Sequence, residues 1–207
     1  MNSFLLRLLN QLLVKTVRGF SRKAGAGALV VMVVALLGVS VFELPANAAN
    51  DTTSAFSLSG KVVHVSDGDT FNLLVNGRTE RIRMASIDAP EIGKGNQQPG
   101  QPYGQASRQA LSDLIAGKTV VLQCFERDRY ERAICDVGLS DGTTANQRQV
   151  RQGMAWANTE KRGQFLRDSS LPELQQQARR QGLGLWRDAH PVEPWAWRYH
   201  CWRQRQC

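Results

Sequence analysis

The sequence has no internal repeat with a period of about 20 to 50 residues, which excludes a solenoid or a propeller. Glycine and proline are too sparse for a collagen-like chain, with 18 and 7 residues among 207. The length suffices for one domain with attachments but not for two full-sized domains. Because 42% of the residues are hydrophobic and 21% charged, the composition is that of a globular protein rather than a disordered one.

Charge is also absent from residues 24–42, which follow a basic stretch ending at Lys23. The small residues Ala46 and Ala48 come next, as a signal peptidase requires, so residues 1–48 are predicted to be a signal peptide. An uncleaved membrane anchor is the alternative, because the uncharged stretch is just long enough to span a bilayer. We therefore expect a secreted or periplasmic protein, or a membrane-anchored one if the signal is retained, and an oxidising environment for its cysteines.

The net charge is +8, but half of it belongs to the predicted signal peptide. Residues 1–48 contain five basic groups and one acidic group, which leaves 21 basic and 17 acidic groups in the remaining chain. The exported part is thus only mildly basic. This charge fits a polyanionic substrate without requiring one.

Five short strand-like segments come mostly before and around three helical segments. The dipeptide Asn76-Gly77 is a strong hairpin signal between two of the strands. Short strands with hairpin-like connections favour a small closed β-barrel with helices, an α+β fold, over a doubly wound sheet. The predicted strands are 61–65, 70–75, 78–84, 119–125 and 133–139, and the predicted helices are 104–116, 146–153 and 171–181.

Two acidic clusters lie at the ends of predicted strands. Asp67 and Asp69 separate the first two strands, whereas Asp88 and Glu91 follow the third. Either cluster alone also fits ordinary turn chemistry, because Asp-Gly and Asp-x-Pro sequences favour turns. Together, strand ends joined by a hairpin can converge on one point, and such hard oxygen ligands select Ca²⁺ or Mg²⁺ rather than zinc.

Two arginines complete the pattern. Arg83 lies five residues before Asp88, and Arg132 lies just beyond the sequence Asp128-Arg129-Tyr130. Guanidinium groups bind phosphate oxygens through two hydrogen bonds and stay charged at any working pH. A divalent cation, a further carboxylate and two arginines are the groups needed to hydrolyse a phosphodiester.

The sequence resembles the staphylococcal-nuclease-like (thermonuclease) family over roughly residues 57–190. The resemblance implies an OB-type five-stranded barrel with three helices. It also implies a Ca²⁺-dependent endonuclease, with Mg²⁺ as the alternative ion, that cleaves DNA and RNA and leaves 3′-phosphates. The residues that carry the resemblance are 67–71, 81–91 and 128–132, with weaker matches at Asn146, 150–155 and 184–186.

The resemblance assigns the metal ligands. Asp69 and Asp88 would bind the cation together with the backbone carbonyl of Ala89. Asp67 would lie behind them and hold the metal-binding loop. Ala89 replaces a threonine of the best-known member, but the family requires only the carbonyl at this position.

The resemblance also assigns the groups that act on the phosphate. Glu91 would position or deprotonate the attacking water, and Arg83 and Arg132 would contact the scissile phosphate. Arg129 would contact a neighbouring phosphate. The sequence departs from the family at Glu131, where glycine is usual, and this departure affects the turn before Arg132 and adds a negative charge there.

Cys124 and Cys135 flank the predicted turn before Arg132 symmetrically. If Arg127 pairs with Arg132, the two cysteines face each other across the hairpin. Directly opposed β-carbons are about 4.5–5.5 Å apart, close to the spacing of a disulfide. We expect a disulfide here, with two free buried thiols as the alternative.

Residues 186–207 contain four of the five tryptophans together with four arginines. Such a segment can stack on bases and follow a phosphate backbone, or its tryptophans can simply pack on the barrel. Cys201 and Cys207 form a second candidate disulfide. A zinc site that also uses His190 and His200 is the alternative.

An exported metal-dependent nuclease is therefore the leading hypothesis. A nucleic-acid-binding OB module without activity and a purely structural envelope protein are the alternatives, but the first would normally lack part of the site. We expect a monomer with DNA and RNA as substrates and no stable protein partner. The predicted organisation is a signal peptide at 1–48, a linker at 49–56, the OB domain at 57–190 and a Trp/Arg/Cys-rich tail at 191–207.

Overall fold

The computed structural model describes residues 55–207, all within a unit that begins at Asp51. The predicted signal peptide and most of the predicted linker lie outside the described residues. In the described part of the chain, no helix has the length and apolar character needed to cross a membrane.

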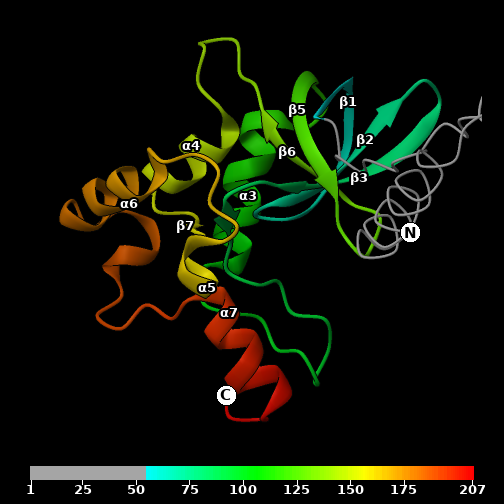
Figure 1. Ribbon diagram of the computed structural model, residues 1–207. Helices are drawn as coiled ribbons and strands as arrows, with labels where there is room; N and C mark the ends of the chain where they lie inside the picture. Colours follow the sequence, from blue (N-terminus) through cyan, green and yellow to red (C-terminus); the bar gives the residue numbers. More distant parts are fainter. Residues whose placement is uncertain (1–54) are drawn as a thin grey trace, which may run out of the picture. The chain divides into compact units, whose positions relative to one another are not determined.

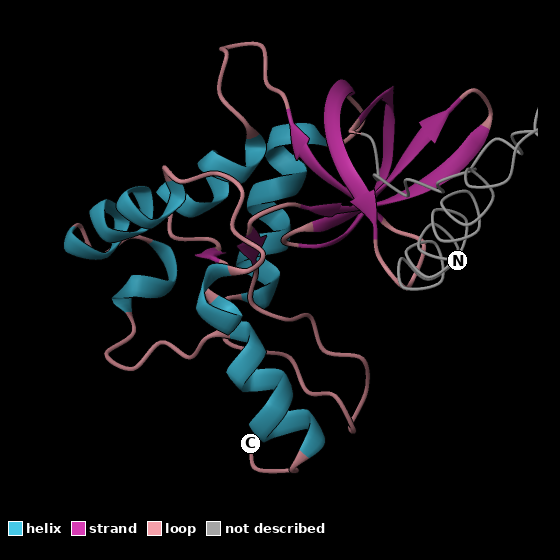
Figure 2. Ribbon diagram, in the orientation of Figure 1, coloured by secondary structure: helices cyan, strands magenta, loops and turns pink. Residues whose placement is uncertain are grey.

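Five strands close into a barrel in the spatial order β1-β2-β3-β6-β5 (Figures 1 and 2). Neighbouring strands are antiparallel except β3 and β6, which are parallel. The predicted barrel with helices is thereby confirmed. The strands are β1 (Phe56–Asp67), β2 (Thr70–Val75), β3 (Arg78–Met84), β5 (Thr119–Arg127) and β6 (Ala133–Val137).

The β2–β3 hairpin follows directly from local sequence. Phe71, Leu73 and Ile82 alternate with more exposed neighbours and are fully buried, so one face of the hairpin lines the core. Asn76 and Gly77 both have positive φ, 48° and 79°, as a tight hairpin turn requires. Turn chemistry and alternation together set the register of this hairpin.

Strand β1 is longer than the predicted strand at 61–65 because it pairs with two partners. Its first half pairs with β5, from Phe56 opposite Cys124 to Lys61 opposite Thr119. Its second half pairs with β2. In the first half Phe56 and Leu58 are partly buried against the core and alternate with exposed serines, so both this short alternation and the pairing with β5 favour an extended strand.

The three predicted helices are present. The first lies between the barrel and the other two, since it contacts both β1 and the second helix, which in turn contacts the third (Figure 1). Leu111 and Ile115 of the first helix are fully buried against the barrel. The helices are α3 (Gly104–Ile115), α4 (Ala145–Arg151) and α6 (Leu171–Arg180).

The structure also contains short elements that the sequence did not predict. The two-stranded pair β4–β7 places Asp88 beside Trp156, and two consecutive helical segments end the chain. These elements are β4 (Ile87–Asp88), β7 (Trp156–Ala157), α5 (Glu160–Gly163), η1 (Gly184–Arg187), α7 (Pro194–Trp197) and the π-helix η2 (Arg198–Arg203).

The C-terminal segment, residues 191–207, packs against the domain through its tryptophans. The rings of Trp195 and Trp156 are edge-to-face with centroids 6.2 Å apart. The indole nitrogens of Trp197 and Trp202 both donate to the carbonyl of Pro99, at 3.3 and 2.9 Å. These contacts agree with the packing interpretation of the tail.

All four cysteines are in disulfides. Cys124 and Cys135 face each other on β5 and β6, with Cα atoms 4.0 Å apart. The expected register was wrong by one residue at the turn, since Arg127 pairs with Ala133, and an irregularity before Glu126 restores the cysteine pairing.

Cys201 and Cys207 form the second disulfide, which closes the end of the C-terminal segment. Both sulfur atoms are thereby used, so this pair provides no thiolate for the alternative zinc site. Within residues 55–207 no group of three or more histidine, cysteine and acidic side chains is arranged to hold a metal ion.

Candidate active site

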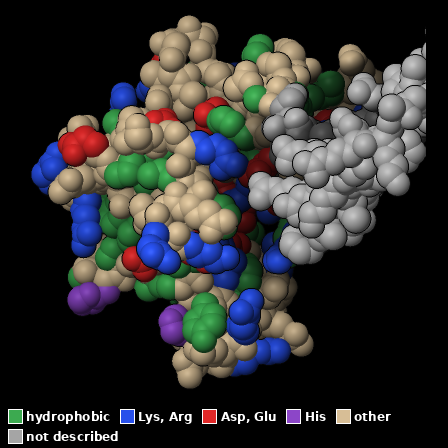
Figure 3. Space-filling view, viewed as in Figure 1, with side chains coloured by type: hydrophobic (Ala, Val, Ile, Leu, Met, Phe, Trp, Pro, Cys, Tyr) green, Lys and Arg blue, Asp and Glu red, His purple; other side chains and the backbone are tan. Residues whose placement is uncertain are grey.

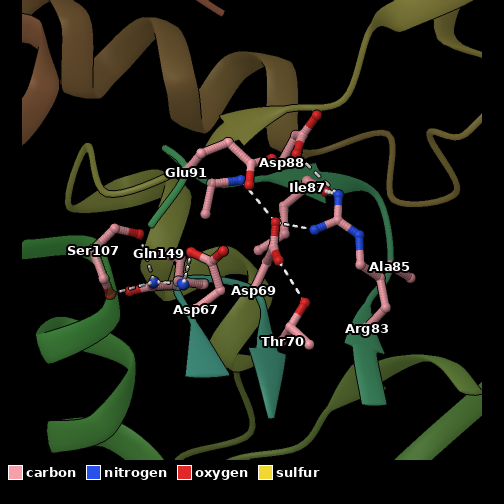
Figure 4. Close-up of polar contacts among 12 residues, drawn as sticks. Asp67, Asp69, Thr70, Arg83, Ala85, Ile87, Asp88, Glu91, Ser107 and Gln149 are labelled. Atoms are coloured by element: carbon pink, nitrogen blue, oxygen red, sulfur yellow. Dashed lines mark hydrogen bonds and ion pairs between the residues drawn. The ribbon is translucent and has the colours of Figure 1, made fainter. Parts of the chain in front are cut away.

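The predicted site residues from the first two motifs meet at one end of the barrel (Figure 4). The β1–β2 turn supplies Asp67 and Asp69, strand β3 supplies Arg83, and β4 with the loop after it supplies Asp88 and Glu91. Asp69, Asp88 and Glu91 are buried, at 3%, 0% and 9% exposure. Carboxylates at this depth require charged partners to remain ionised.

Asp69 is held on both oxygens. Its Oδ1 accepts a hydrogen bond from the Thr70 hydroxyl at 2.9 Å, and its Oδ2 accepts one from the backbone nitrogen of Ala89 at 2.8 Å and pairs with Arg83. Burial alone would raise the pKa of Asp69, but the charge and hydrogen bond of Arg83 hold that pKa below its ordinary value. Asp69 is therefore an ionised acceptor that joins the β1–β2 turn to the β4 loop.

Arg83 bridges the two predicted metal ligands. Its Nη1 pairs with Asp69, and its Nη2 donates to Asp88 Oδ1 at 2.9 Å. Burial opposes the charge of this guanidinium, yet the two carboxylates raise the pKa of Arg83 above its ordinary value. The Arg83 side chain as a whole is 17% exposed.

A third arginine, which sequence reasoning missed, enters the site from η2. Arg198 Nη2 donates to Asp88 Oδ2 at 2.7 Å. Its Nη1 donates to Asp88 Oδ1 at 3.0 Å and to Glu91 Oε1 at 2.6 Å. The only sequence signal for this residue was its place in the Trp/Arg-rich tail.

The site holds more negative than positive charge. Four carboxylates face two guanidiniums, those of Arg83 and Arg198, and Asp67 is the one carboxylate of the four that makes no ion pair with either. Burial, and then the charges of Asp69 and Glu91, raise the pKa of Asp67 to about 7. Burial also raises the pKa of Glu91, although Arg198 opposes this effect.

This excess fits a divalent cation bound through hard oxygen ligands. The predicted ligand set is two aspartates and the carbonyl of Ala89, and these groups lie on adjoining loops linked by the hydrogen bond between Asp69 and Ala89. Ca²⁺ and Mg²⁺ prefer such oxygen donors and accept few protein ligands together with water. The chemistry of this donor set, two carboxylate side chains and one backbone carbonyl, therefore fits the implied metal, although within the described residues no group of three or more acidic, histidine or cysteine side chains is arranged to hold an ion.

Two polar side chains behind the β1–β2 turn were also missed by sequence reasoning. The Nε2 of Gln149, on α4, donates to the Gly68 carbonyl at 2.7 Å and to the Ser107 carbonyl at 3.1 Å (Figure 4). A Cβ on Gly68 would lie 1.9 Å from the Ser107 hydroxyl, so the turn is pressed against α3. Helices α3 and α4 thus fix the position of the turn that carries Asp67 and Asp69.

Asn146 connects β6 to the residues after β3. Its Oδ1 accepts from the backbone nitrogen of Val137 at 3.0 Å, and its Nδ2 donates to the carbonyl of Ala85 at 2.9 Å. The family resemblance included this position only as a weak match. Its buried amide links the strand after the Arg132 turn to the segment between Arg83 and Asp88.

Arg132 is not joined to the buried carboxylates. Its guanidinium pairs with Asp128 at 2.6 Å, and burial of that acid is outweighed by hydrogen bonds, chiefly from Arg132, that lower the pKa of Asp128. Arg129 stacks on Tyr130, 4.8 Å from the ring centroid. Glu131 has a φ of 60°, the left-handed conformation that explains why glycine is usual at this position in the family.

The fold and the site together define a barrel hydrolase of the nuclease type. A family model described as staphylococcal nuclease homologue matches residues 81–188, so the chain belongs to that family. The matched region includes Arg83, Asp88, Glu91 and Arg132 and ends before Arg198.

Curated relatives agree with this assignment. An uncharacterized endonuclease of Escherichia coli is 44% identical over 142 residues, covering 69% of this chain and 86% of the relative. A micrococcal nuclease of Shigella flexneri is 40% identical over 147 residues, covering 67% and 79%. Protein ParB of Escherichia coli is 36% identical over 152 residues, covering 68% and 79%.

Proposed function

We propose that the protein is an exported metal-dependent endonuclease that hydrolyses phosphodiester bonds of DNA and RNA and leaves 3′-phosphates. Ca²⁺ is the proposed ion, with Mg²⁺ as the alternative. The observation that carries the proposal is the cluster of four carboxylates around only two guanidiniums. A cluster of this kind, in a family of nucleases, is suited to a divalent cation and a phosphate.

In this proposal Asp69, Asp88 and the carbonyl of Ala89 hold the cation. When bound, the cation supplies Lewis acidity toward a phosphate oxygen and neutralises part of the charge on the carboxylates. The hydrogen bonds of Asp69 to Thr70 and Ala89 keep its carboxylate oriented before any ligand arrives. A site organised in advance avoids the cost of reorganisation during the reaction.

Glu91 positions a water molecule and accepts its proton as the water attacks phosphorus. Burial raises the pKa of Glu91, which makes its carboxylate a stronger base than an exposed one. Its backbone is fixed by Gln101, whose nitrogen donates to the Glu91 carbonyl at 2.9 Å. The general base thus lies in an anchored part of the loop after β4.

Arg83 stabilises the charge that grows on the phosphoryl oxygens, since its planar guanidinium can follow that charge with two hydrogen bonds. Arg132 approaches from the neighbouring strand, because β6 begins at Ala133, which pairs with Ile82 of β3. Exchange of its Asp128 partner for a phosphate oxygen would bring Arg132 to the substrate. Arg129 is proposed to contact the next phosphate.

The surface charge supports a polyanionic substrate, and the pairing of the cysteines supports an oxidising compartment. Lysine and arginine side chains recur over the visible face of the domain, which favours a polyanion (Figure 3). Two disulfides that use all four cysteines are typical of an oxidising compartment, so we propose secretion or a periplasmic location after cleavage near Ala48. We further propose that the protein acts as a monomer.

One assay tests the proposal. Purified mature protein is incubated with plasmid DNA and with RNA in Ca²⁺, in Mg²⁺ and in chelator, with the Asp88→Asn variant as the matched control. We expect cleavage by the wild type with a divalent cation and a loss of activity in chelator or in the variant. Binding without cleavage under every condition would favour the inactive nucleic-acid-binding module instead.

A further inference from the structure

We propose that Arg198 is a further residue of this site, supplied by the C-terminal segment, and that its guanidinium, which also pairs with Glu91, competes with the divalent cation for Asp88. The inference rests on the proposed metal dependence. Arg198 acts through these two carboxylates, so it is a positioning residue that sets how tightly the site binds its cation.

Arg198 contacts both oxygens of Asp88, one of the proposed cation ligands. Both carboxylate oxygens of Asp88 accept from Arg198, and Oδ1 also accepts from Arg83. One oxygen of Glu91 accepts from Arg198 at 2.6 Å. Oδ1 of Asp88 already accepts from two guanidiniums, so a cation at this oxygen must replace one of them. A cation at Oδ2 would lie beside the Arg198 guanidinium, and the two like charges would repel each other.

The C-terminal segment holds Arg198 in this place from both sides. Trp197 and Trp202 flank it in sequence on α7 and η2 and donate to one carbonyl, that of Pro99. Cys201 is buried and joined to Cys207, which closes the segment directly after this anchor. Arg198 is therefore held by an ordered segment, and its ion pairs differ from those of mobile side chains on the surface.

The loop that carries Glu91 also holds the C-terminal segment. Pro99 belongs to this loop, and Gln101 donates to the carbonyl of Val192 at 2.6 Å. The Arg198 side chain is nevertheless 33% exposed, so the guanidinium can exchange its carboxylate partners for water without unfolding the anchor. An anchored backbone with an exchangeable guanidinium is suited to a group that leaves the cation site when the cation binds.

The test is calorimetric titration of Ca²⁺ and of Mg²⁺ into the mature protein, with its C-terminal segment intact, after treatment with chelator. Arg198→Gln removes the charge, and we expect it to tighten Ca²⁺ binding by about tenfold or more, because a nearby like charge no longer opposes the cation. Arg198→Lys keeps the charge and should remain close to the wild type. Arg203→Gln is the matched control on η2, since the Arg203 guanidinium lies over the Tyr199 ring instead of the carboxylates.

Thermal unfolding gives a readout that is independent of activity. In chelator, Arg198→Gln should unfold at a lower temperature than the wild type, because Asp88 and Glu91 lose a cationic partner. Added Ca²⁺ should then raise its midpoint by more than it raises that of the wild type. Circular dichroism checks that each variant is folded.

The outcomes separate this inference from the proposed function. Equal or weaker Ca²⁺ binding by folded Arg198→Gln would overturn the role of Arg198 and leave metal-dependent hydrolysis intact. Cation binding by Arg198→Gln but not by the wild type would support the inference in its strongest form. Absence of cation binding in every variant, with nucleic acid cleaved in chelator, would overturn the metal dependence and the inference with it.

Discussion

Arg83 joins Asp69 to Asp88, so a single buried guanidinium links the β1–β2 turn to β4. The two aspartates lie on different motifs, and their relative position depends on this bridge. Arg83 is thus placed to organise the predicted metal ligands.

Replacement of Arg83 by lysine should lower the rate of cleavage. Lysine keeps the charge but loses the fork that binds two oxygens at once, and loss of one oriented donor costs about 10²–10³ in rate. Single-turnover cleavage of a defined oligonucleotide measures the effect, with circular dichroism to confirm folding. Arg81→Lys, two positions earlier on β3, is the control, and an equal loss in that variant would contradict the assignment.

Replacement of Gly68 by alanine should displace the turn that carries Asp67 and Asp69. The new methyl group would meet the Ser107 hydroxyl, and overpacking of this kind costs about 1–3 kcal/mol of stability. Urea unfolding and Ca²⁺ titration should both show a loss. Gly77→Ala is the control for Ca²⁺ binding, because nothing lies within 4 Å of its added methyl group. Its φ of 79° should make this variant less stable too, but Ca²⁺ binding should stay unchanged.

Replacement of Glu131 by glycine should stabilise the protein. Its φ of 60° is unfavourable for residues with a side chain, and the expected gain in unfolding free energy is up to about 1 kcal/mol. Urea unfolding measures this gain. Glu131→Ala removes the negative charge but keeps the backbone strain, so an equal gain in both variants would show that charge, and not conformation, is responsible.

Asp136 should make stability depend on pH. Burial, and then the charge of Asp168, raise its pKa from 3.8 to about 6, although Arg167 opposes the effect. The folded protein therefore retains a proton that the unfolded chain has lost, and this contribution to stability falls as the pH rises from about 4 to about 6.

Asp136→Asn cannot ionise and should remove that fall. Relative to the wild type, the variant should be more stable at about pH 7.5 than at about pH 4.5, as measured by urea unfolding in each buffer. A constant difference between variant and wild type across this range would show that Asp136 does not titrate as described.

Local chemistry explains why parts of the fold could be predicted. The bounds of β2 and β3 agree with the predicted strands, because alternation and the Asn76-Gly77 turn act over a few neighbouring residues. The acidic clusters were recognisable for the same reason, since each lies within one turn. The predicted Cys124–Cys135 disulfide is present. The pairing near the turn differs by one residue from the expected one, and an irregularity in β5, which no local pattern indicated, brings the two cysteines opposite each other.

The sequence by itself determined the strands β2 and β3, the family and the residues of the two acidic motifs. Only the tertiary structure decided that Gln149 supports the β1–β2 turn and that Arg198 reaches Asp88 across 110 positions of the chain. Neither contact follows a helical or strand period, so no sequence pattern marks it. A buried carboxylate without a charged partner is costly, and any arginine that lies close enough can act as that partner. Which arginine this is depends on how the helices and the C-terminal segment pack.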